Sequence, residues 1–263
     1  MSVLFDMELR ALRRDWAARV GPELFLHERA FEDCLDRISL IQRTFEHALL
    51  IGCPDAKWPD RLRRFAKRVD ARDPGRLFAE AAGGETIVED AWTPEPAEYD
   101  LIVALGTLDT VNDLPRALLA MRFCMRPEAL LIGAMSGGET LPKLRSAMRA
   151  ADHTTGAASP HVHPRIEASA LAPLLTAAGF VNAVVDIDRV QVAYRTLDRL
   201  VGDLRRMAAT NLLVSRARTP LSKRASAEAA RCFGEAAIND RTVEVFEILH
   251  FACWTSPAAE DAE

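Results

Sequence analysis

Apolar and polar positions between residues 99 and 134 predict a strand, a helix and a second strand. Residues 101–104 and 130–134 are short, uninterrupted apolar runs, as expected of strands that are buried on both faces. Between these runs, Asp113 is placed to cap a helix that has Pro115 in its first turn. A strand, a helix and a strand within about 35 residues form a parallel βαβ unit. The pattern therefore predicts an α/β fold with helices on both faces of the sheet.

The same kind of pattern predicts further elements on either side of this unit. Helices are expected where apolar residues recur every three or four positions, over residues 5–20, 25–41, 61–67, 139–151, 168–178, 196–214 and 222–237. Strands are expected where apolar residues run together or alternate with polar ones, over residues 47–53, 68–70, 85–92, 180–194 and 242–251.

The composition is that of a folded globular protein. Of the 263 residues, 49 % are hydrophobic and 27 % are charged, so the chain can form one large α/β domain, with or without a sizeable insertion. The net charge of −5 argues against nucleic acid as the main partner, because phosphate binding favours a basic surface.

Cysteine and histidine usage points away from a metal site. The five cysteines are scattered and include no Cys-x-x-Cys pair, which suits a reduced compartment. His161 and His163 have a spacing compatible with a metal on a strand, but they lack a third ligand nearby, so a flexible lid is the favoured interpretation and no metal is predicted. The chain starts without a signal-peptide pattern and has no apolar run as long as a membrane span, so the expected location is the cytoplasm.

Three motifs carry a resemblance to a known family. Residues 100–103 read Asp-Leu-Ile-Val, residues 111–115 read Val-Asn-Asp-Leu-Pro, and residues 137–141 read Gly-Gly-Glu-Thr-Leu. Together with the stretch 194–221, they resemble class I S-adenosylmethionine-dependent methyltransferases. The most similar members by motif are the respiratory complex I assembly-factor methyltransferase-like proteins, which are associated with arginine hydroxylation. The malonyl-carrier-protein methyltransferases of biotin synthesis are more distant.

The resemblance implies a Rossmann-like sheet of seven strands with helices on both faces and the last strand antiparallel. It also implies an N-terminal helical cap over residues 1–45 and a methyltransferase-like α/β domain over residues 46–263. A helical insertion at about residues 195–240 would cover the cleft.

The loop after the first predicted strand departs from the family pattern. Gly52 is kept, but Pro54 and Ala56 stand where glycines are expected. Proline fixes φ and removes a backbone donor, so this loop cannot adopt the usual cofactor-binding shape unchanged. The expected cofactor is S-adenosylmethionine, and these two replacements put its binding in question.

Two aspartates are candidate ligands of that cofactor. Asp70 has a spacing from Gly52 suited to a carboxylate that binds a ribose diol, with an exposed loop aspartate as the equal alternative. Asp90 follows the third predicted strand, where the family places a carboxylate for the adenine amino group. The full cofactor set implied by the resemblance is Gly52, Cys53, Asp70, Asp90, Ala91 and Leu105.

The substrate side is expected from two later segments. The residues predicted to face a substrate or partner are Glu139, Tyr194, Arg205 and Asn211. Arginine can pair with an acidic group through two parallel hydrogen bonds, and asparagine can both donate and accept. The alternative is that Arg205, like Arg206, belongs to a solvated helix face.

Three functions remain open from the sequence. The first is a methyltransferase, whose chemistry depends mainly on proximity and orientation, so that the absence of a catalytic triad is no objection. The second is a non-catalytic binding or assembly module on the same fold, favoured by Pro54 and Ala56. The third, implied by the resemblance alone, is an arginine-modifying hydroxylase. The expected partner is a protein or small-molecule methyl acceptor, with a respiratory complex I subunit as one candidate.

Overall fold

The computed structural model describes residues 3–156 and 158–258. Its strands are β1 (Phe45–Ile51), β2 (Ala66–Asp73), β3 (Glu85–Thr86), β4 (Tyr99–Leu105), β5 (Met125–Ser136), β6 (Phe180–Tyr194) and β7 (Thr242–Thr255). Its helices are α1 (Met7–Val20), α2 (Phe25–Ser39), α3 (Trp58–Leu62), α4 (Arg76–Ala81), α5 (Leu114–Cys124), α6 (Pro142–Thr155), α7 (Ala168–Ala177), α8 (Leu197–Arg206) and α9 (Lys223–Glu235), with a short 3₁₀ helix η1 (Leu108–Thr110).

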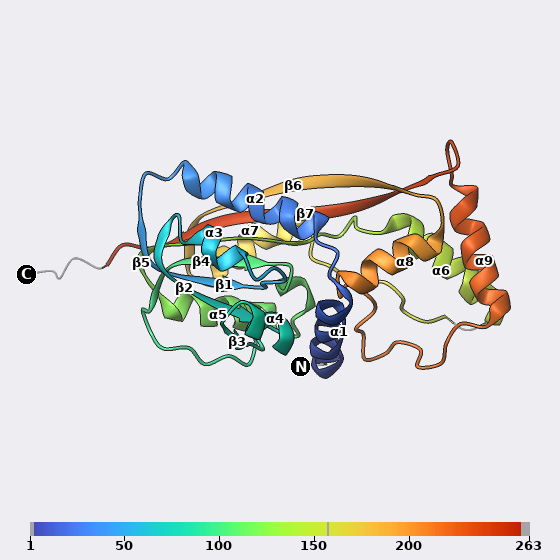
Figure 1. Cartoon of the computed structure of the whole chain (residues 1–263), viewed down its shortest axis with the longest axis horizontal. Coiled ribbons are helices and arrows are strands. Elements are labelled where there is room, and N and C mark those ends of the chain that lie inside the picture. Colours follow the sequence, from blue (N-terminus) through green and yellow to red (C-terminus); the bar gives the residue numbers. More distant parts are fainter. Residues whose placement is uncertain (1–2, 157, 259–263) are drawn as a thin grey trace, which may run out of the picture.

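The strands form one sheet in the order β3-β2-β1-β4-β5-β7-β6 (Figure 1). Strands β1 to β5 run parallel to one another, whereas β7 is antiparallel to both β5 and β6. The prediction of a seven-stranded α/β sheet with an antiparallel last strand is confirmed for the described residues. The capping prediction also holds, because the Asp113 side chain accepts a hydrogen bond from the backbone N–H of Arg116 at the start of α5.

Both faces of the central strands are covered. Every residue of β4 is buried, as expected of a strand with helices on both sides. One face packs against α5 and α7, and the other packs against α2 and α3. On the second face, the rings of Phe31 and Trp58 stack with their centroids 4.4 Å apart. Helix α2 is therefore part of the main core, although it lies in the segment expected to be a cap.

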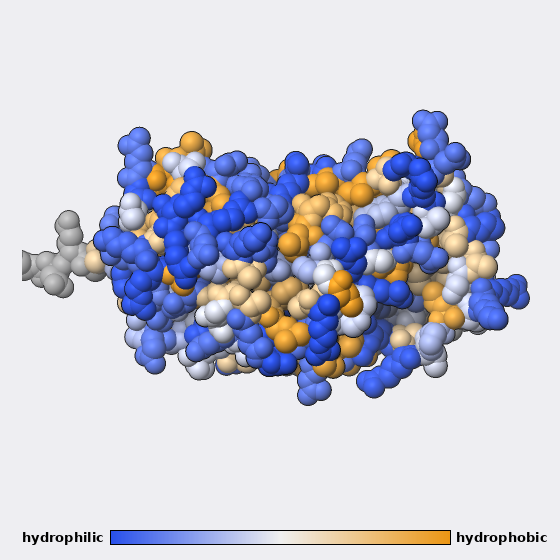
Figure 2. Space-filling view, viewed as in Figure 1, coloured by the Kyte–Doolittle hydropathy of each residue, from blue (hydrophilic) through white to orange (hydrophobic). Residues whose placement is uncertain are grey.

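Strands β6 and β7 extend well beyond their neighbours and carry a second lobe (Figure 1). Helices α6, α8 and α9 pack there around a separate apolar cluster that includes Tyr194, Phe233 and Phe246. In the space-filling view, hydrophobic residues reach the surface near the middle of the molecule, between the two lobes (Figure 2). The lobes thus share one continuous pair of strands and meet at an apolar junction.

Three predicted elements differ from the observed ones. The helix expected over residues 61–67 ends at Leu62, because Ala66 begins the pairing of β2 with β1. The strand expected over residues 85–92 is only the two-residue β3. The helix expected over residues 196–214 ends at Arg206, because Ala208 adopts a left-handed backbone with φ of 58°.

Within the described ranges, none of the helices combines the length and apolar character required to traverse a membrane.

Replacing Phe31 with alanine should strongly destabilise the protein. The ring is fully buried against Trp58, so its removal leaves a cavity, and a loss of about 3–5 kcal/mol in the free energy of unfolding is expected. Urea denaturation followed by Trp fluorescence or circular dichroism measures this. Phe123→Ala, at a position that is 58 % exposed, is the matched control and should change stability by about 0.5 kcal/mol or less. Equal losses in the two variants would contradict the packing described here.

Candidate functional site

The carboxyl ends of β1, β2, β4 and β5 meet at one edge of the sheet, where open α/β sheets bind their ligands. Gly52 follows β1 in a left-handed conformation with φ of 82°. A Cβ at this position would lie 2.0 Å from the carbonyl oxygen of Leu105, so only glycine fits. The one glycine kept in the loop is therefore required by the close approach of two strand ends.

Asp73, the last residue of β2, is the central carboxylate of this edge. It is completely buried. Its Oδ1 accepts hydrogen bonds from Arg14 Nε at 2.7 Å and from the N–H of Gly75 at 2.7 Å. Its Oδ2 accepts from Arg14 Nη2 at 2.5 Å and from the N–H of Cys53 at 2.8 Å. Four donors thus use the accepting capacity of this carboxylate, and two of them come from α1.

A second buried pair joins α1 to the segment after β3. Arg10 donates from Nη1 and Nη2 to the two carboxylate oxygens of Glu89, at 2.7 and 2.8 Å. Its Nη2 also donates to the carbonyl oxygen of Thr107 just beyond β4. Burial alone would lower the pKa of Arg10, but the attraction of Glu89 outweighs it, so the pKa is raised. Arg10 therefore stays cationic in the core.

In this arrangement the edge does not fit an adenosyl group. The carboxylate at the end of β2 is of the type that binds ribose hydroxyls, but Arg14 and two backbone N–H groups already occupy it. Glu89 is equally engaged by Arg10. Two arginines of α1 thus occupy the carboxylates that a ribose would need.

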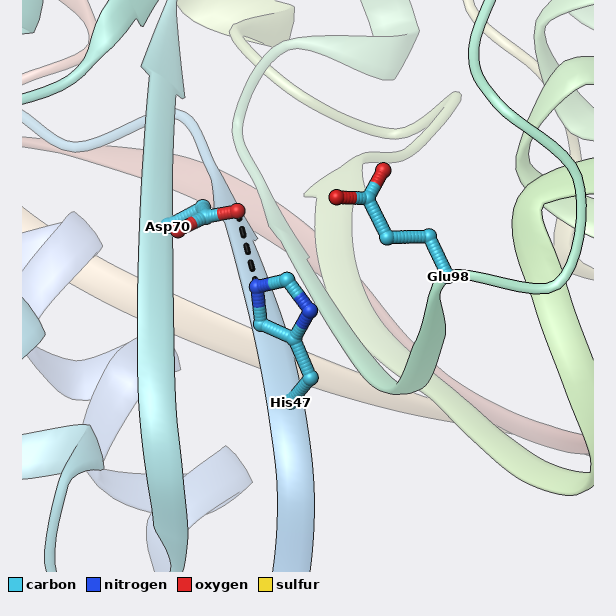
Figure 3. A group of neighbouring side chains, drawn as sticks. All are labelled: His47, Asp70 and Glu98. Atoms are coloured by element: carbon cyan, nitrogen blue, oxygen red, sulfur yellow. Dashed lines mark hydrogen bonds and ion pairs between the residues drawn. The ribbon is translucent and has the colours of Figure 1, made fainter.

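Asp70 does not lie where it was predicted. It is three residues before the carboxyl end of β2, and it points toward the beginnings of β1 and β4 rather than toward the ligand edge. Its Oδ2 lies 2.8 Å from His47 Nε2 (Figure 3). The same oxygen accepts a hydrogen bond from the Tyr99 hydroxyl at 3.1 Å. The difference arises because β2 continues to Asp73, beyond residue 70, where the predicted strand ends.

Glu98 lies beside this pair, so that one ligand atom each from His47, Asp70 and Glu98 fall within 4.8 Å of one another (Figure 3). His47 lies near the beginning of β1, Asp70 lies within β2, and Glu98 directly precedes β4. The hydrogen bonds to His47 and Tyr99 already account for the position of the Asp70 carboxylate, so the group is an ordinary polar network of the sheet.

Asp90 lies beyond β3, as predicted, but its side chain is engaged. Its Oδ2 accepts hydrogen bonds from the backbone N–H groups of Asn112 and Asp113, at 2.8 and 3.0 Å, and so stabilises the start of α5. Ala91 is exposed in the adjoining turn. A role of these residues in adenine binding stays a prediction.

A cavity of about 120 Å³ lies beside this edge, between the main sheet and the second lobe. The residues with polar side chains on its wall are Arg10, Arg14, His27, Asp109, Thr110, Ser136, Thr140, His163, Arg165 and Glu247. Of the residues predicted to contact the cofactor, Leu105 lines this cavity, whereas Gly52 and Cys53 do not. The backbone N–H of Cys53 donates to Asp73 instead. Burial raises the pKa of the Cys53 thiol, so it is not a poised nucleophile.

The predicted substrate residues lie in three separate places. Arg205 and Asn211 both line an open groove beside the cavity, under α6 and α8. Asn211 lies beyond the end of α8, and its side-chain amide donates to the carbonyl oxygen of Pro160 at 2.7 Å. Glu139 lies at a smaller hollow, and Tyr194 is buried in the core of the second lobe. Substrate binding by these residues stays a prediction.

The two histidines of the central loop have separate partners. His161 Nε2 lies 2.9 Å from an oxygen of Asp152, whereas His163 Nε2 accepts a hydrogen bond from the backbone N–H of Leu212 at 2.7 Å. Burial lowers the pKa of His163 to about 3 and that of His27 to about 4, so both rings are neutral. His163 joins the loop to the segment after α8 and closes one end of the cavity.

The sequence analysis missed the residues that dominate this edge: Arg10, Arg14, Asp73, Glu89 and Arg165. Arg10 and Arg14 are four positions apart on one helix face, but charged residues on a helix suggest a solvated surface. The signal that could have found Asp73 is the Pro74-Gly75 turn, which marks the end of β2 directly after it.

Comparisons with known proteins agree with this architecture. A family model described as a methyltransferase domain matches residues 25–185. The mitochondrial arginine-hydroxylase NDUFAF5 of Mus musculus is 30 % identical over 95 % of this chain and 77 % of its own length. The chain spans 64 % of the rat and human proteins of that name. A malonyl-[acyl-carrier protein] O-methyltransferase of Xylella fastidiosa (strain M23) is 31 % identical over 62 % of this chain and 54 % of its own length.

Among solved structures, the N-methyltransferase NodS of Bradyrhizobium japonicum WM9, in complex with S-adenosylhomocysteine, superposes with a TM-score of 0.50 at 15 % identity. The match covers 94 % of this chain and 98 % of NodS. The resemblance inferred from the motifs is confirmed.

Breaking the Arg14–Asp73 pair should cost far more than a surface ion pair. Arg14→Met leaves a fully buried carboxylate without its counter-charge, and a loss of about 3–5 kcal/mol in the free energy of unfolding is expected. The double variant Arg14→Met with Asp73→Asn removes the stranded charge as well, so it should lose less than the sum of the single variants. Urea denaturation measures the three values, and simple additivity would contradict direct coupling.

Stability should fall in acid because of His163. Its pKa is about 3 in the folded chain and about 6.5 when unfolded, so the unfolded state binds the extra proton as the pH drops below 6.5. The stability that comes from the neutral ring is therefore fully present above pH 6.5 and is lost toward pH 3. The loss in the free energy of unfolding amounts to about 2 kcal/mol at pH 5. His163→Gln should flatten the slope of unfolding free energy against pH, whereas His153→Gln, at an exposed position, should not. An unchanged slope in His163→Gln would rule out this origin.

Proposed function

The chain belongs to the methyltransferase-domain family and to the family of the NDUFAF5 arginine-hydroxylases, and from this we propose that it is an S-adenosylmethionine-dependent methyltransferase-like protein acting in respiratory complex I assembly. The relatives support this by their identity over most of the chain. The partner proposed is a respiratory complex I subunit, as the resemblance to the complex I assembly-factor proteins implies, and the name of the mouse relative describes an activity on arginine.

The observation that carries the cofactor part of the proposal is the chemistry of the sheet edge. A carboxylate ends β2, a glycine with no room for a side chain follows β1, and a second carboxylate follows β3. Asp73 is the residue proposed to hold the ribose hydroxyls. Because Arg14 and Arg10 occupy these carboxylates here, cofactor binding requires α1 to withdraw from the edge.

A non-catalytic assembly module on the same fold is the second candidate. It is favoured by the two buried ion pairs that fill the edge and by Pro54 and Ala56 in the adjoining loop. Under this alternative, the arginines of α1 have replaced the cofactor permanently, and the fold serves only to bind partners.

Titration calorimetry with S-adenosylhomocysteine separates the two candidates. If the cofactor binds after withdrawal of α1, the double variant Arg10→Gln with Arg14→Gln should weaken the two ion pairs that hold this helix. The affinity for S-adenosylhomocysteine should then rise by about tenfold or more, because less of the binding energy is used to move α1. Asp73→Asn should weaken binding by about tenfold, as expected for hydrogen bonds to a charged acceptor.

Arg19→Gln is the matched control, because it removes the same charge from an exposed position of α1. It should leave the affinity unchanged. Arg14→Lys, which keeps the charge but loses the fork of donors, serves if the double variant does not fold. Absence of binding in every folded variant would reject the cofactor part and favour the assembly module.

A further inference from the structure

The cavity beside the sheet edge holds three arginines, and only two of them have a carboxylate at hydrogen-bond distance. Arg10 and Arg14 each make a two-pronged pair, with Glu89 and Asp73. Arg165 does not. Its Nε is buried and has no hydrogen-bond partner among the described residues, and the nearest carboxylate oxygen, on Asp109, is 4.0 Å away.

The environment of Arg165 makes this unusual. Its side chain is only 5 % exposed, and within the part of the chain that the structure describes its one hydrogen-bond acceptor is the carbonyl oxygen of His163, 3.3 Å from Nη1. Burial of a guanidinium without a partner is costly, and an arginine fork is suited to a carboxylate. The group is therefore prepared for an acceptor that the chain itself does not supply.

Among the described residues, the nearby acidic groups do not form a hydrogen bond with Arg165. The Oδ2 of Asp109 lies 4.0 Å from Arg165 Nε, beyond hydrogen-bond distance. Glu247 also lines the cavity, but its Oε2 accepts a hydrogen bond from Arg189 Nε at 3.0 Å. A small anion in the cavity would provide the acceptor that Arg165 Nε lacks.

The other residues that line the cavity indicate what kind of anion fits. The cavity is also lined by apolar side chains from α2, α8, β7 and the segments before α6 and after α8, among them Leu26, Leu141, Leu204, Leu212, Phe246 and Ile248. A strongly hydrated anion such as inorganic phosphate would lose its water without finding enough donors there. A single carboxylate on an apolar chain matches both parts of the wall.

We propose that this cavity binds the carboxylate of a small molecule with an apolar chain, with the guanidinium of Arg165 pairing with the carboxylate and the apolar wall covering the chain. His27 Nδ1 is also buried without a hydrogen-bond partner among the described residues, and it is a second donor at the site in the tautomer that carries its proton there. A cationic ligand is disfavoured, since it would meet Arg165 beside Arg10 and Arg14.

This site goes beyond the proposed function and does not depend on it. Carboxylate binding needs neither an adenosyl cofactor nor a methyl acceptor. The experiment below is therefore done without S-adenosylhomocysteine, and its result stands whether or not that compound binds.

The test is calorimetric titration of the full chain with butanoate, hexanoate and octanoate, alongside octan-1-ol and octylamine. Affinity should rise about fourfold for each added methylene until the cavity is filled. Octanoate should bind about tenfold or more tightly than octan-1-ol, because only the carboxylate pairs with Arg165. Tighter binding of octylamine than of octanoate would overturn the proposal.

Arg165→Met should abolish the preference for octanoate over octan-1-ol while keeping the dependence on chain length. Arg149→Met, which removes an exposed arginine of α6, is the matched control and should keep the preference. If Arg165→Met does not fold, Arg165→Lys replaces it and should reduce the preference, since a lysine offers no fork. A full preference in a folded Arg165 variant, or no binding of any carboxylate to the native chain, would refute the site.

Discussion

Two buried arginine–carboxylate pairs determine how this molecule is put together. Arg14 with Asp73 and Arg10 with Glu89 join the N-terminal helix to the carboxyl edge of the sheet. Buried ion pairs contribute little net stability compared with apolar contacts, but breaking one by removing a single partner is expensive. Such pairs therefore act mainly on conformation: they make one position of α1 much better than any other, and they decide what space remains at the edge.

The remaining space follows from that position. With α1 seated, the adenosyl side of the cleft is filled, and the free volume lies between the sheet and the second lobe. The polar groups of this cavity belong to segments far apart in the chain: α2, η1, the loop around His163, and β7. The frame is that of the methyltransferase-domain family, and in this structure the charged side chains at its ligand edge pair with one another.

The sequence was informative wherever apolar pattern alone determines an element. The buried run at residues 101–104 and the alternation over residues 180–194 gave β4 and β6 in the right places. It was less informative where a single backbone angle sets the boundary of an element, as before α6 and after α8. Leu141 and Ala208 both adopt left-handed conformations, with φ of 63° and 58°, and no residue type at these positions announces this. The candidate site suffered most, because pairing of Arg14 with Asp73 depends on contacts between distant segments.

The long β6–β7 pair gives the two walls of the cavity different mechanical properties. One wall is built on β7, whose strand pairing extends from β5 in the main sheet to the far end of β6 in the second lobe, with one irregularity between Val181 and Val184. This pairing stiffens β7, so Phe246 and Ile248, which line the cavity, have a firm support. The opposite wall is α1, whose Arg10 and Arg14 reach the sheet edge through their side chains. In the withdrawal of α1 proposed above, the cavity would therefore widen from one side, with β7 as the stationary wall and the N-terminal helix as the moving one.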